Sequence, residues 1–213
     1  MTTDDPTVFN SIPWVSALLH DKSFVTYTIP SRTVKPSTED NLFSKTLNTS
    51  TTFSACLSQY RRPSGLECEP STTDFEPNTD THPSSSSSPS SPITELRMFF
   101  MLGSDLNGYP GILHGGIAAT LLDECTGLLL ALNGQVGDAV TRQEPGSRPG
   151  PVTAYLNTRF LRPVPTPGVV MVQARMVEGE GDRKWRIEGR LVDGEGLALV
   201  EAEALYVRPR SRI

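Results

Sequence analysis

The sequence predicts an α+β fold in which one long apolar helix lies across an antiparallel sheet. A stretch with helical periodicity covers residues 115–132, four stretches of strand character follow it, and short turns separate these strands. Consecutive strands with short connections are expected to be antiparallel neighbours. A helix that precedes them can cover the apolar face of their sheet, which gives an α+β layer fold.

The N-terminal region, residues 1–60, carries weaker patterns and is predicted to be a partly helical extension. Residues 13–19 place their large apolar side chains on one side and predict a short helix. Residues 24–29 are rich in β-branched and aromatic side chains and predict a short strand. Residues 38–62 begin with acids and end with arginines, and their apolar residues recur near helical spacing, so we expect one or two amphipathic helices. Amphipathicity indicates packing rather than motion, which favours a structural clasp over a lid above the substrate.

The segment of residues 61–93 is rich in Ser, Pro and Thr and poor in large apolar side chains. Such a segment cannot bury enough surface to offset the entropy lost on ordering, so we expect a disordered linker. Residues 94–209 are then expected to form a single domain.

The elements of residues 94–209 follow from their local sequence. Residues 95–102 are largely apolar and end at Gly103, which predicts a strand. Residues 133–151 are dense in Gly and Pro, which predicts a long loop. The later strands are predicted at residues 152–161, 169–177, 184–192 and 197–207.

The predicted helix has two different faces at 100° per residue. One face is an apolar stripe that should lie on the sheet. Asp123 lies on the other face among small residues, and Glu124 lies at the edge of the stripe. Small residues allow a ligand or another chain to come close, and a buried carboxylate needs a partner or a function. The stripe consists of Ile117, Leu121, Cys125, Leu128 and Leu132.

The helix begins with the sequence HGG at residues 114–116. Amide groups in the first turn of a helix have no intrahelical partner, and the helix dipole makes this end partly positive. The helix start therefore predicts an electrophilic hole, while Asp123 on the same helix is a candidate base.

The composition narrows the possible partners and locations. The chain has 19 basic and 24 acidic residues without a basic block, so nucleic acid is not an expected partner. The N-terminus shows no signal or transit pattern, and no apolar run approaches the roughly 18 residues that a membrane span needs, so a cytoplasmic protein is expected. The cysteines lack metal-like spacing and are expected to be free thiols. They are Cys56, Cys68 and Cys125.

The HGG motif of residues 114–116, with Asp123 nine residues after the histidine, resembles the hotdog-fold acyl-CoA thioesterases of the phenylacetic-acid-pathway and human thioesterase-superfamily kind. Residues 152–164 are similar to the second strand of that family. The resemblance covers about residues 94–208. It implies a hotdog fold, an antiparallel sheet wrapped around one long central helix.

The resemblance also implies hydrolysis of an acyl thioester, carried by coenzyme A or an acyl-carrier protein. Asp123 would be the general base or the nucleophile, and the Gly115 N–H would hold the oxyanion. His114 would orient the substrate or the helix start, and Thr153 would position the attacking water. The expected substrate-binding residues are Gly116, Asn107, Glu124 and Arg162.

Asn107 and Arg162 each have a competing residue nearby in the sequence. Some relatives carry an asparagine six residues before the histidine, where this chain has Gly108, with Asn107 one residue earlier. Arg162 is favoured as a phosphate contact over Arg142 and Arg148 of the long loop, which we interpret as solvated.

The family generally dimerises through its sheets and central helices, which implies a homodimer or a dimer of dimers. Asp123 of one subunit would then face Gly115 of the other, with two composite sites per dimer. No resident cofactor or metal is implied, since coenzyme A enters as part of the substrate.

Three alternatives stay open. The first is a hotdog hydratase or dehydratase, which needs a histidine and an acid to converge on the substrate. The second is a non-catalytic acyl-thioester-binding partner of an acyl or polyketide synthesis system. The third is a metal site made by His114, Asp123 and Glu124, which is disfavoured because the two acids point about 100° apart.

Overall fold

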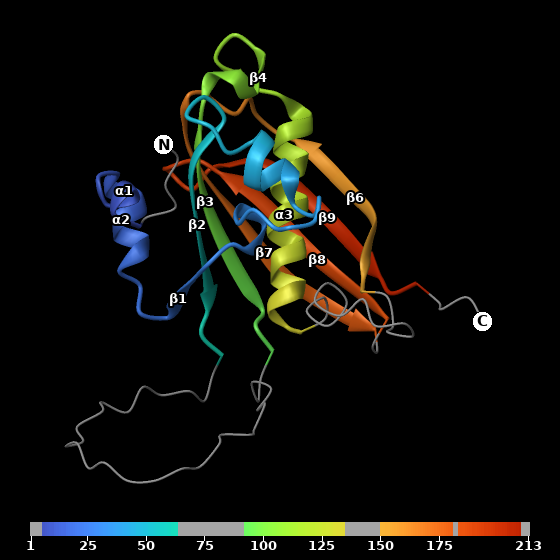
Figure 1. Cartoon of the computed structure of the whole chain (residues 1–213). Helices are drawn as coiled ribbons and strands as arrows, with labels where there is room; N and C mark the ends of the chain where they lie inside the picture. The colour runs from blue at the N-terminus through green and yellow to red at the C-terminus, as the bar shows by residue number, and fades with distance from the viewer. Residues whose placement is uncertain (1–5, 64–91, 135–149, 181–182, 210–213) are drawn as a thin grey trace, which may run out of the picture.

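The computed structural model describes residues 6–63, 92–134, 150–180 and 183–209. Its centre is a seven-stranded antiparallel sheet in the order β1-β2-β3-β7-β8-β9-β6, which curves around the long helix α3 (Figure 1). The predicted α+β class and hotdog arrangement are thereby confirmed. The strands of the sheet are β1 (Phe24–Tyr27), β2 (Phe53–Arg61), β3 (Glu95–Leu102), β6 (Val152–Phe160), β7 (Gly168–Glu180), β8 (Lys184–Val192) and β9 (Ala198–Val207).

The other elements are short, apart from α3. A small second sheet joins β4 (Asn107–Tyr109) to β5 (Ile112–Leu113) just before α3 (Gly115–Leu132). The remaining helices are α1 (Pro6–Asn10), α2 (Pro13–Leu19), and the short turns η1 (Pro30–Arg32), η2 (Leu42–Thr46) and η3 (Ser104–Leu106).

Helix α3 packs its apolar stripe on the concave face of the sheet, in the main core. The predicted orientation is confirmed, since Leu121 and Cys125 are fully buried and Leu128 is nearly so. Ile117 and Leu132, near the two ends of the helix, are only partly buried. Both cysteines that the structure describes, Cys56 and Cys125, are free and buried, whereas Cys68 lies outside the described residues.

By length and composition alone, α3 is the one described helix that could cross a membrane, with a mean hydropathy of 1.4 over 18 residues. The sequence-based expectation overlooked it, because Asp123 and Glu124 interrupt the apolar run. Packing in the core against the sheet accounts for the apolar character of this helix.

The N-terminal region holds two strands of the sheet. The predicted helix at residues 13–19 and the strand from Phe24 are confirmed, but the amphipathic helices predicted for residues 38–62 are wrong. The structure has only the turn η2 there, followed by β2. Strand β2 lies between β1 and β3 and is buried on both faces, so its apolar residues do not alternate and resemble a helical pattern. The sheet therefore includes strands on both sides of residues 64–91, which lie outside the described residues.

Helices α1 and α2 cover the outer face of the sheet at β2 and β3 (Figure 1). A second apolar cluster forms there, in which Phe9 and Val15 of the helices contact Leu57 and Phe99 of the strands. This cluster explains why both faces of β2 are apolar.

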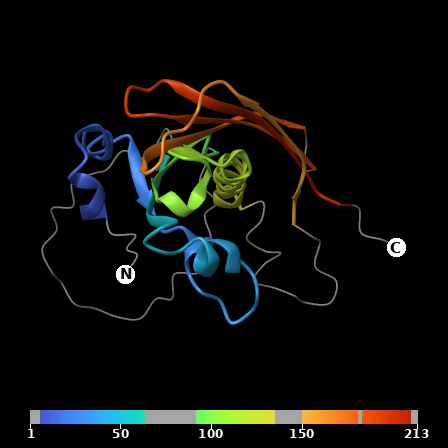
Figure 2. The same cartoon turned by 90° about the horizontal axis from the view of Figure 1, so that it is seen from above.

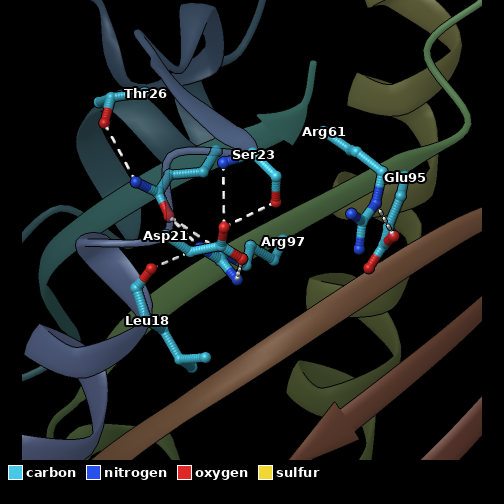
Figure 3. A network of polar contacts seen from close by, with 8 residues as sticks. Leu18, Asp21, Ser23, Thr26, Arg61, Glu95 and Arg97 are labelled. Atoms are coloured by element: carbon cyan, nitrogen blue, oxygen red, sulfur yellow. Dashed lines mark hydrogen bonds and ion pairs between the residues drawn. The ribbon is translucent and has the colours of Figure 1, made fainter. Parts of the chain in front are cut away.

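Arg97 of β3 fixes these N-terminal elements to the sheet (Figure 3). This arginine is only 4% exposed. The guanidinium donates to Gln59 Oε1 at 2.8 and 3.0 Å and to the Leu18 carbonyl at 2.7 Å, and it lies 3.6 Å from the Phe24 ring centroid. One buried cation thus joins α2, β1, β2 and β3.

The segment between β1 and β2 covers the side of α3 that faces away from the sheet (Figure 2). Arg32 is buried here and donates to the carbonyls of Phe43 and Phe53, each at 3.2 Å. The Ser31 hydroxyl donates to the Glu124 carboxylate on α3. Helix α3 is therefore enclosed between the sheet and this N-terminal segment.

Strand β6 is an exception to the predicted strand order. Consecutive strands were expected to be neighbours, but β6 pairs with β9 at the edge of the sheet and not with β7. The connection carries Pro163, Pro165 and Pro167, and it pairs with β5 through Leu113 N–H to Val164 O at 2.9 Å. The chain therefore passes β9 and β8 between β6 and β7, and these two strands do not form a tight hairpin.

Candidate functional site

The start of α3 leaves one amide group without an acceptor. His114 is the N-cap, and its ring Nδ1 accepts from the Gly116 N–H at 3.0 Å. The His114 carbonyl oxygen accepts from the N–H groups of Ile117 and Ala118, at 3.0 and 3.1 Å. Among the described residues, the Gly115 N–H has no hydrogen-bond acceptor. It is therefore the open donor at the positive end of the helix dipole.

Each of the two glycines of the HGG motif is required for a different steric reason. A Cβ on Gly116 would lie 3.1 Å from His114 Nδ1, so glycine here lets the ring reach the amide. A Cβ on Gly115 would lie 3.3 Å from the Phe160 ring of β6. On the other side of the histidine, a Cβ on Gly108 would lie 3.1 Å from His114 Cα. The close approach of His114 thus favours glycine at position 108.

A pocket of about 570 Å³ opens beside the Gly115 amide. Its wall is mainly apolar, with Phe160 of β6 58% exposed at the mouth. His114 and Arg162 are its basic side chains, and the Arg162 guanidinium donates to the Ala198 carbonyl at 2.9 Å. The lining residues are Gly108, Tyr109, Ile112, Leu113, His114, Gly115, Ala118, Phe160, Leu161, Arg162, Pro163 and Val164.

The Asp123 carboxylate is held by hydroxyl groups from two strands. Thr153 of β6 donates to Asp123 Oδ1 at 3.0 Å. The Tyr206 hydroxyl of β9 lies 3.3 Å from the same oxygen and 3.1 Å from the Asp123 carbonyl. Asp123 is partly buried, so its carboxylate has fixed partners and still reaches the surface.

Gly115 and Asp123 do not meet within one chain. They are eight residues apart on α3, which at 1.5 Å per residue separates them by about 12 Å along the helix axis. A base and an oxyanion donor must both lie about 3 Å from the reacting group. Within one chain, the pocket at Gly115 and the carboxylate at Asp123 are too far apart to act on the same reacting group, and we call them the two half-sites.

Three predicted substrate contacts lie outside the pocket lining. Glu124 points to the N-terminal segment, where Ser31 donates to it; burial raises the pKa of its carboxyl to about 7, although the Ser31 bond acts in the opposite direction. Asn107 accepts from the Thr166 hydroxyl. Gly116 is exposed beside the His114 ring.

Sequence reasoning missed three residues of this region, namely Ser31, Phe160 and Tyr206. Phe160 and Tyr206 stand on strands whose alternation points them to the inner face, and Thr153 is the register partner of Tyr206. That alternation could have indicated Tyr206. Ser31 lies 93 residues from Glu124 in a turn with no distinctive pattern.

Two further predictions concern the long loop and a metal site. Arg142 and Arg148 lie outside them, as does most of the predicted loop. Within the described part of the chain, no group of three His, Cys, Asp or Glu side chains is arranged to hold a metal ion.

Comparison with known proteins gives the class that this fold and site define. The family model described as thioesterase superfamily matches residues 110–200. Verlamelin biosynthesis protein B of Lecanicillium sp is 31% identical over 192 residues, a match that covers 81% of this chain and 75% of that protein. The chain belongs to the thioesterase superfamily.

Two other similar proteins match a smaller share of this chain than the Lecanicillium protein does. The acyl-coenzyme A thioesterase THEM4 of Bos taurus is 34% identical over 110 residues, or 51% of this chain and 39% of that protein. This chain thus spans under half the length of that relative. A hypothetical thioesterase protein with coenzyme A from Streptococcus pneumoniae TIGR4 is 18% identical, with a TM-score of 0.45, over 56% of this chain and 82% of that one.

Proposed function

We propose that this protein hydrolyses acyl thioesters to a free acid and a thiol. The proposal rests on one observation, namely that α3 carries both a free backbone donor and an oriented carboxylate. The helix start offers a free Gly115 N–H beside an apolar pocket, and the Asp123 carboxylate is held by two hydroxyls further along. An oxyanion donor and a base are the two groups that thioester hydrolysis needs.

In the proposed reaction, Asp123 removes a proton from water as the oxygen adds to the thioester carbon. Direct attack by the carboxylate, through a mixed anhydride that water then cleaves, uses the same geometry. The Gly115 N–H donates a hydrogen bond to the developing oxyanion, a contact whose loss typically costs about 3 kcal/mol. When the carbon–sulfur bond breaks, the proton held by Asp123 passes to the leaving thiolate.

We propose further that each site is shared by two copies of the chain. The separation of about 12 Å between the two half-sites supports this arrangement. So does β6, a nine-residue strand whose second edge is unpaired among the described residues. Its inner face is exposed at Thr153 and at Phe160, beside the small-residue face of α3. Long unpaired edges are typical sites of strand addition, so the proposed assembly is a homodimer, alone or within a dimer of dimers.

The proposed substrate is an acyl group carried by coenzyme A or by an acyl-carrier protein. The apolar wall of the pocket suits an acyl chain, and Arg162 at its rim suits a phosphate. Coenzyme A as the carrier is supported by the relative that is named an acyl-coenzyme A thioesterase. The runner-up function is binding of an acyl thioester without turnover in a synthesis system, with which a relative named a biosynthesis protein is equally compatible.

Thiol release from short, long and aromatic acyl thioesters, on both carriers, tests the proposal. Asp123→Asn keeps the shape of the side chain and removes the base, so we expect a loss of about a hundredfold or more in kcat. A parental rate in this variant would refute the mechanism. Addition of water to an enoyl thioester without thiol release would identify a hydratase, and tight binding without thiol release would identify the binding function.

Gly115 offers a matched pair of variants for the oxyanion hole. Gly115→Pro removes the N–H, and proline is tolerated at the first helical position after a residue with the ψ of 132° that His114 has. Gly115→Ala adds the same Cβ next to Phe160 and keeps the N–H. We expect the proline variant to lose most of kcat and the alanine variant to keep most of it.

Mixing tests the shared site. A heterodimer of Asp123→Asn and Gly115→Pro chains has one intact site, because its base comes from one chain and its amide from the other. Co-expression of the two inactive variants should therefore restore about a quarter of parental activity, since half of the dimers are mixed and each has one of two sites. Absence of any recovery, with mixed dimers demonstrated, would place the site within one chain.

A further inference from the structure

We propose that Tyr206 is a positioning residue for Asp123, an inference that rests on the proposed thioesterase function. The Tyr206 hydroxyl and the Thr153 hydroxyl together hold Asp123 Oδ1. The other carboxylate oxygen, Oδ2, is thereby directed to the water or to the thioester carbon.

The position of Tyr206 is set by the sheet. It lies on the inner face of β9, its side chain is 5% exposed, and its register partner on β6 is Thr153. These two side chains, although far apart in sequence, both contact Asp123 of α3. Both hydroxyls approach Asp123 Oδ1, at 3.0 Å from Thr153 and 3.3 Å from Tyr206.

Thr126 orients the phenol from the helix side. It is fully buried, and its Oγ1 lies 2.9 Å from the Tyr206 hydroxyl. The Thr126 hydroxyl also donates to the carbonyls of Leu122 at 2.9 Å and Asp123 at 3.1 Å. Its contact with Tyr206 therefore fixes the phenol oxygen, which lies 3.1 Å from the Asp123 carbonyl oxygen and 3.3 Å from Asp123 Oδ1. A hydrogen bond to a carboxylate is stronger than one to a neutral oxygen, which favours donation of the single phenolic proton to Asp123 Oδ1.

Gly127 is a second, independent sign of the arrangement. A Cβ at this position would lie 3.3 Å from the Tyr206 hydroxyl. Glycine within a helix costs about 1 kcal/mol relative to alanine. Here it leaves room for the phenol one helical turn after Asp123, so the helix and the strand are fitted to each other at this contact.

The two oxygens of the carboxylate have different surroundings. Oδ1 has two hydroxyl partners, whereas Oδ2 has no hydrogen-bond partner among the described residues. Burial, followed by the charge of Asp123, raises the pKa of Tyr206 well above its usual range. The phenol therefore stays protonated and serves as a donor, which leaves Oδ2 as the oxygen free to react.

Tyr206→Phe tests the role because it removes the hydroxyl and keeps the ring. We expect kcat to fall about tenfold while KM changes less than about twofold, because orientation of the base affects the chemical step and not substrate binding. The melting temperature checks that the fold is retained. The matched control is Tyr155→Phe, which removes a hydroxyl that donates to Glu203 at 2.8 Å on the outer face of the same sheet. Its kcat should equal that of the parent.

A double-mutant cycle separates positioning from general structural support. The residual rate of Asp123→Asn should not fall further when Tyr206→Phe is added, because the group that Tyr206 orients no longer acts as a base. Equal falls in both backgrounds would overturn the inference in favour of a structural role. Gly127→Ala, which crowds the phenol, should lower kcat in the same direction as Tyr206→Phe.

The inference and the proposed function fail differently. If Tyr206→Phe keeps the parental kcat while Asp123→Asn is inactive, the positioning role is refuted and the thioesterase mechanism stands. If Asp123→Asn keeps the parental rate, the mechanism fails and the positioning role fails with it.

Discussion

The ring of His114 accepts the amide proton of Gly116, two residues along the chain, at 3.0 Å. The histidine thus caps the helix whose first amide, on Gly115, stays open to the pocket. His114 therefore has a structural role as the N-cap of α3, independent of any chemical role.

Replacing His114 tests this task. His114→Ala removes the cap and should lower the free energy of unfolding by about 1 kcal/mol. His114→Asn provides another capping side chain, so we expect it to recover stability and, because Gly115 is held in place again, most of kcat/KM as well. Denaturation and thiol-release assays on both variants check this. Recovery of stability without recovery of activity would give the imidazole ring a chemical role.

The stability of the protein should depend on Glu124 between pH 4.5 and about 7. Burial raises the pKa of this carboxyl from 4.5 to about 7 in the native protein. In that window the native state binds a proton that the unfolded state has released, so stability is fully present below pH 4.5 and falls as the pH rises through 7. Glu124→Gln removes this titration. Relative to the parent, the variant should gain about 3 kcal/mol between pH 4.5 and pH 8.

The exposed Glu195, in the turn before β9, supplies the control for this titration. Denaturation curves of Glu195→Gln should follow the parent across the same pH range. A constant difference between Glu124→Gln and the parent at every pH would contradict the assignment.

Two arginines on neighbouring strands should differ in their contribution to stability. Arg97→Met leaves the buried Gln59 Oε1 without its donor and removes the bond to the Leu18 carbonyl, which keeps the Asp21 N–H as a donor. We expect a loss of about 3 kcal/mol. Arg61→Met removes an ion pair to Glu95 of 2.6 Å whose arginine is 46% exposed, and we expect a loss below about 1 kcal/mol. Urea denaturation compares them. Similar losses for both variants would mean that Arg97 does not anchor the N-terminal helices.

Two glycines should likewise respond differently to alanine. A Cβ on Gly103 would lie 2.2 Å from the Thr51 carbonyl oxygen, which is backbone, so Gly103→Ala must displace the turn before β2 and should cost about 3 kcal/mol. A Cβ on Gly189 would lie 2.9 Å from Leu122 Cδ2, the end of a side chain that can rotate. Gly189→Ala should therefore cost about 1 kcal/mol. Thermal unfolding gives the order, and a reversed order would refute this account.

The elements that the sequence predicted well are those whose signal is local. Strand β8 alternates cleanly between a charged and an apolar face, and its predicted and observed bounds coincide at residues 184–192. Helix α3 shows its apolar stripe over 18 residues, so both its existence and the face that meets the sheet could be inferred.

The errors arose where tertiary contacts decide. Strand β2 is covered on one face by α3 and on the other by α1 and α2, so its sequence lacks alternation and was interpreted as helical. The place of β6 at the sheet edge depends on a proline-bearing connection that pairs with β5, and nothing within β6 itself signals this.

The candidate site divides in the same way. Gly115, Asp123 and Thr153 were inferred from a motif and a resemblance, and the structure places Thr153 on Asp123 as a hydrogen-bond donor. Ser31 and Tyr206 contact the two acids of α3 from 93 and 83 residues away. Such partners are defined only when the strands pair.

Strands β2 and β3 are direct neighbours, with Arg61 and Glu95 in contact, although a long stretch of chain separates them. Their pairing does not need a covalent connection at that end of the sheet. Residues 1–63 and 92–213, produced as two separate polypeptides, should therefore assemble into one active protein held together by the β2–β3 ladder and the shared cores. The covalent link would raise only the effective concentration of one fragment near the other.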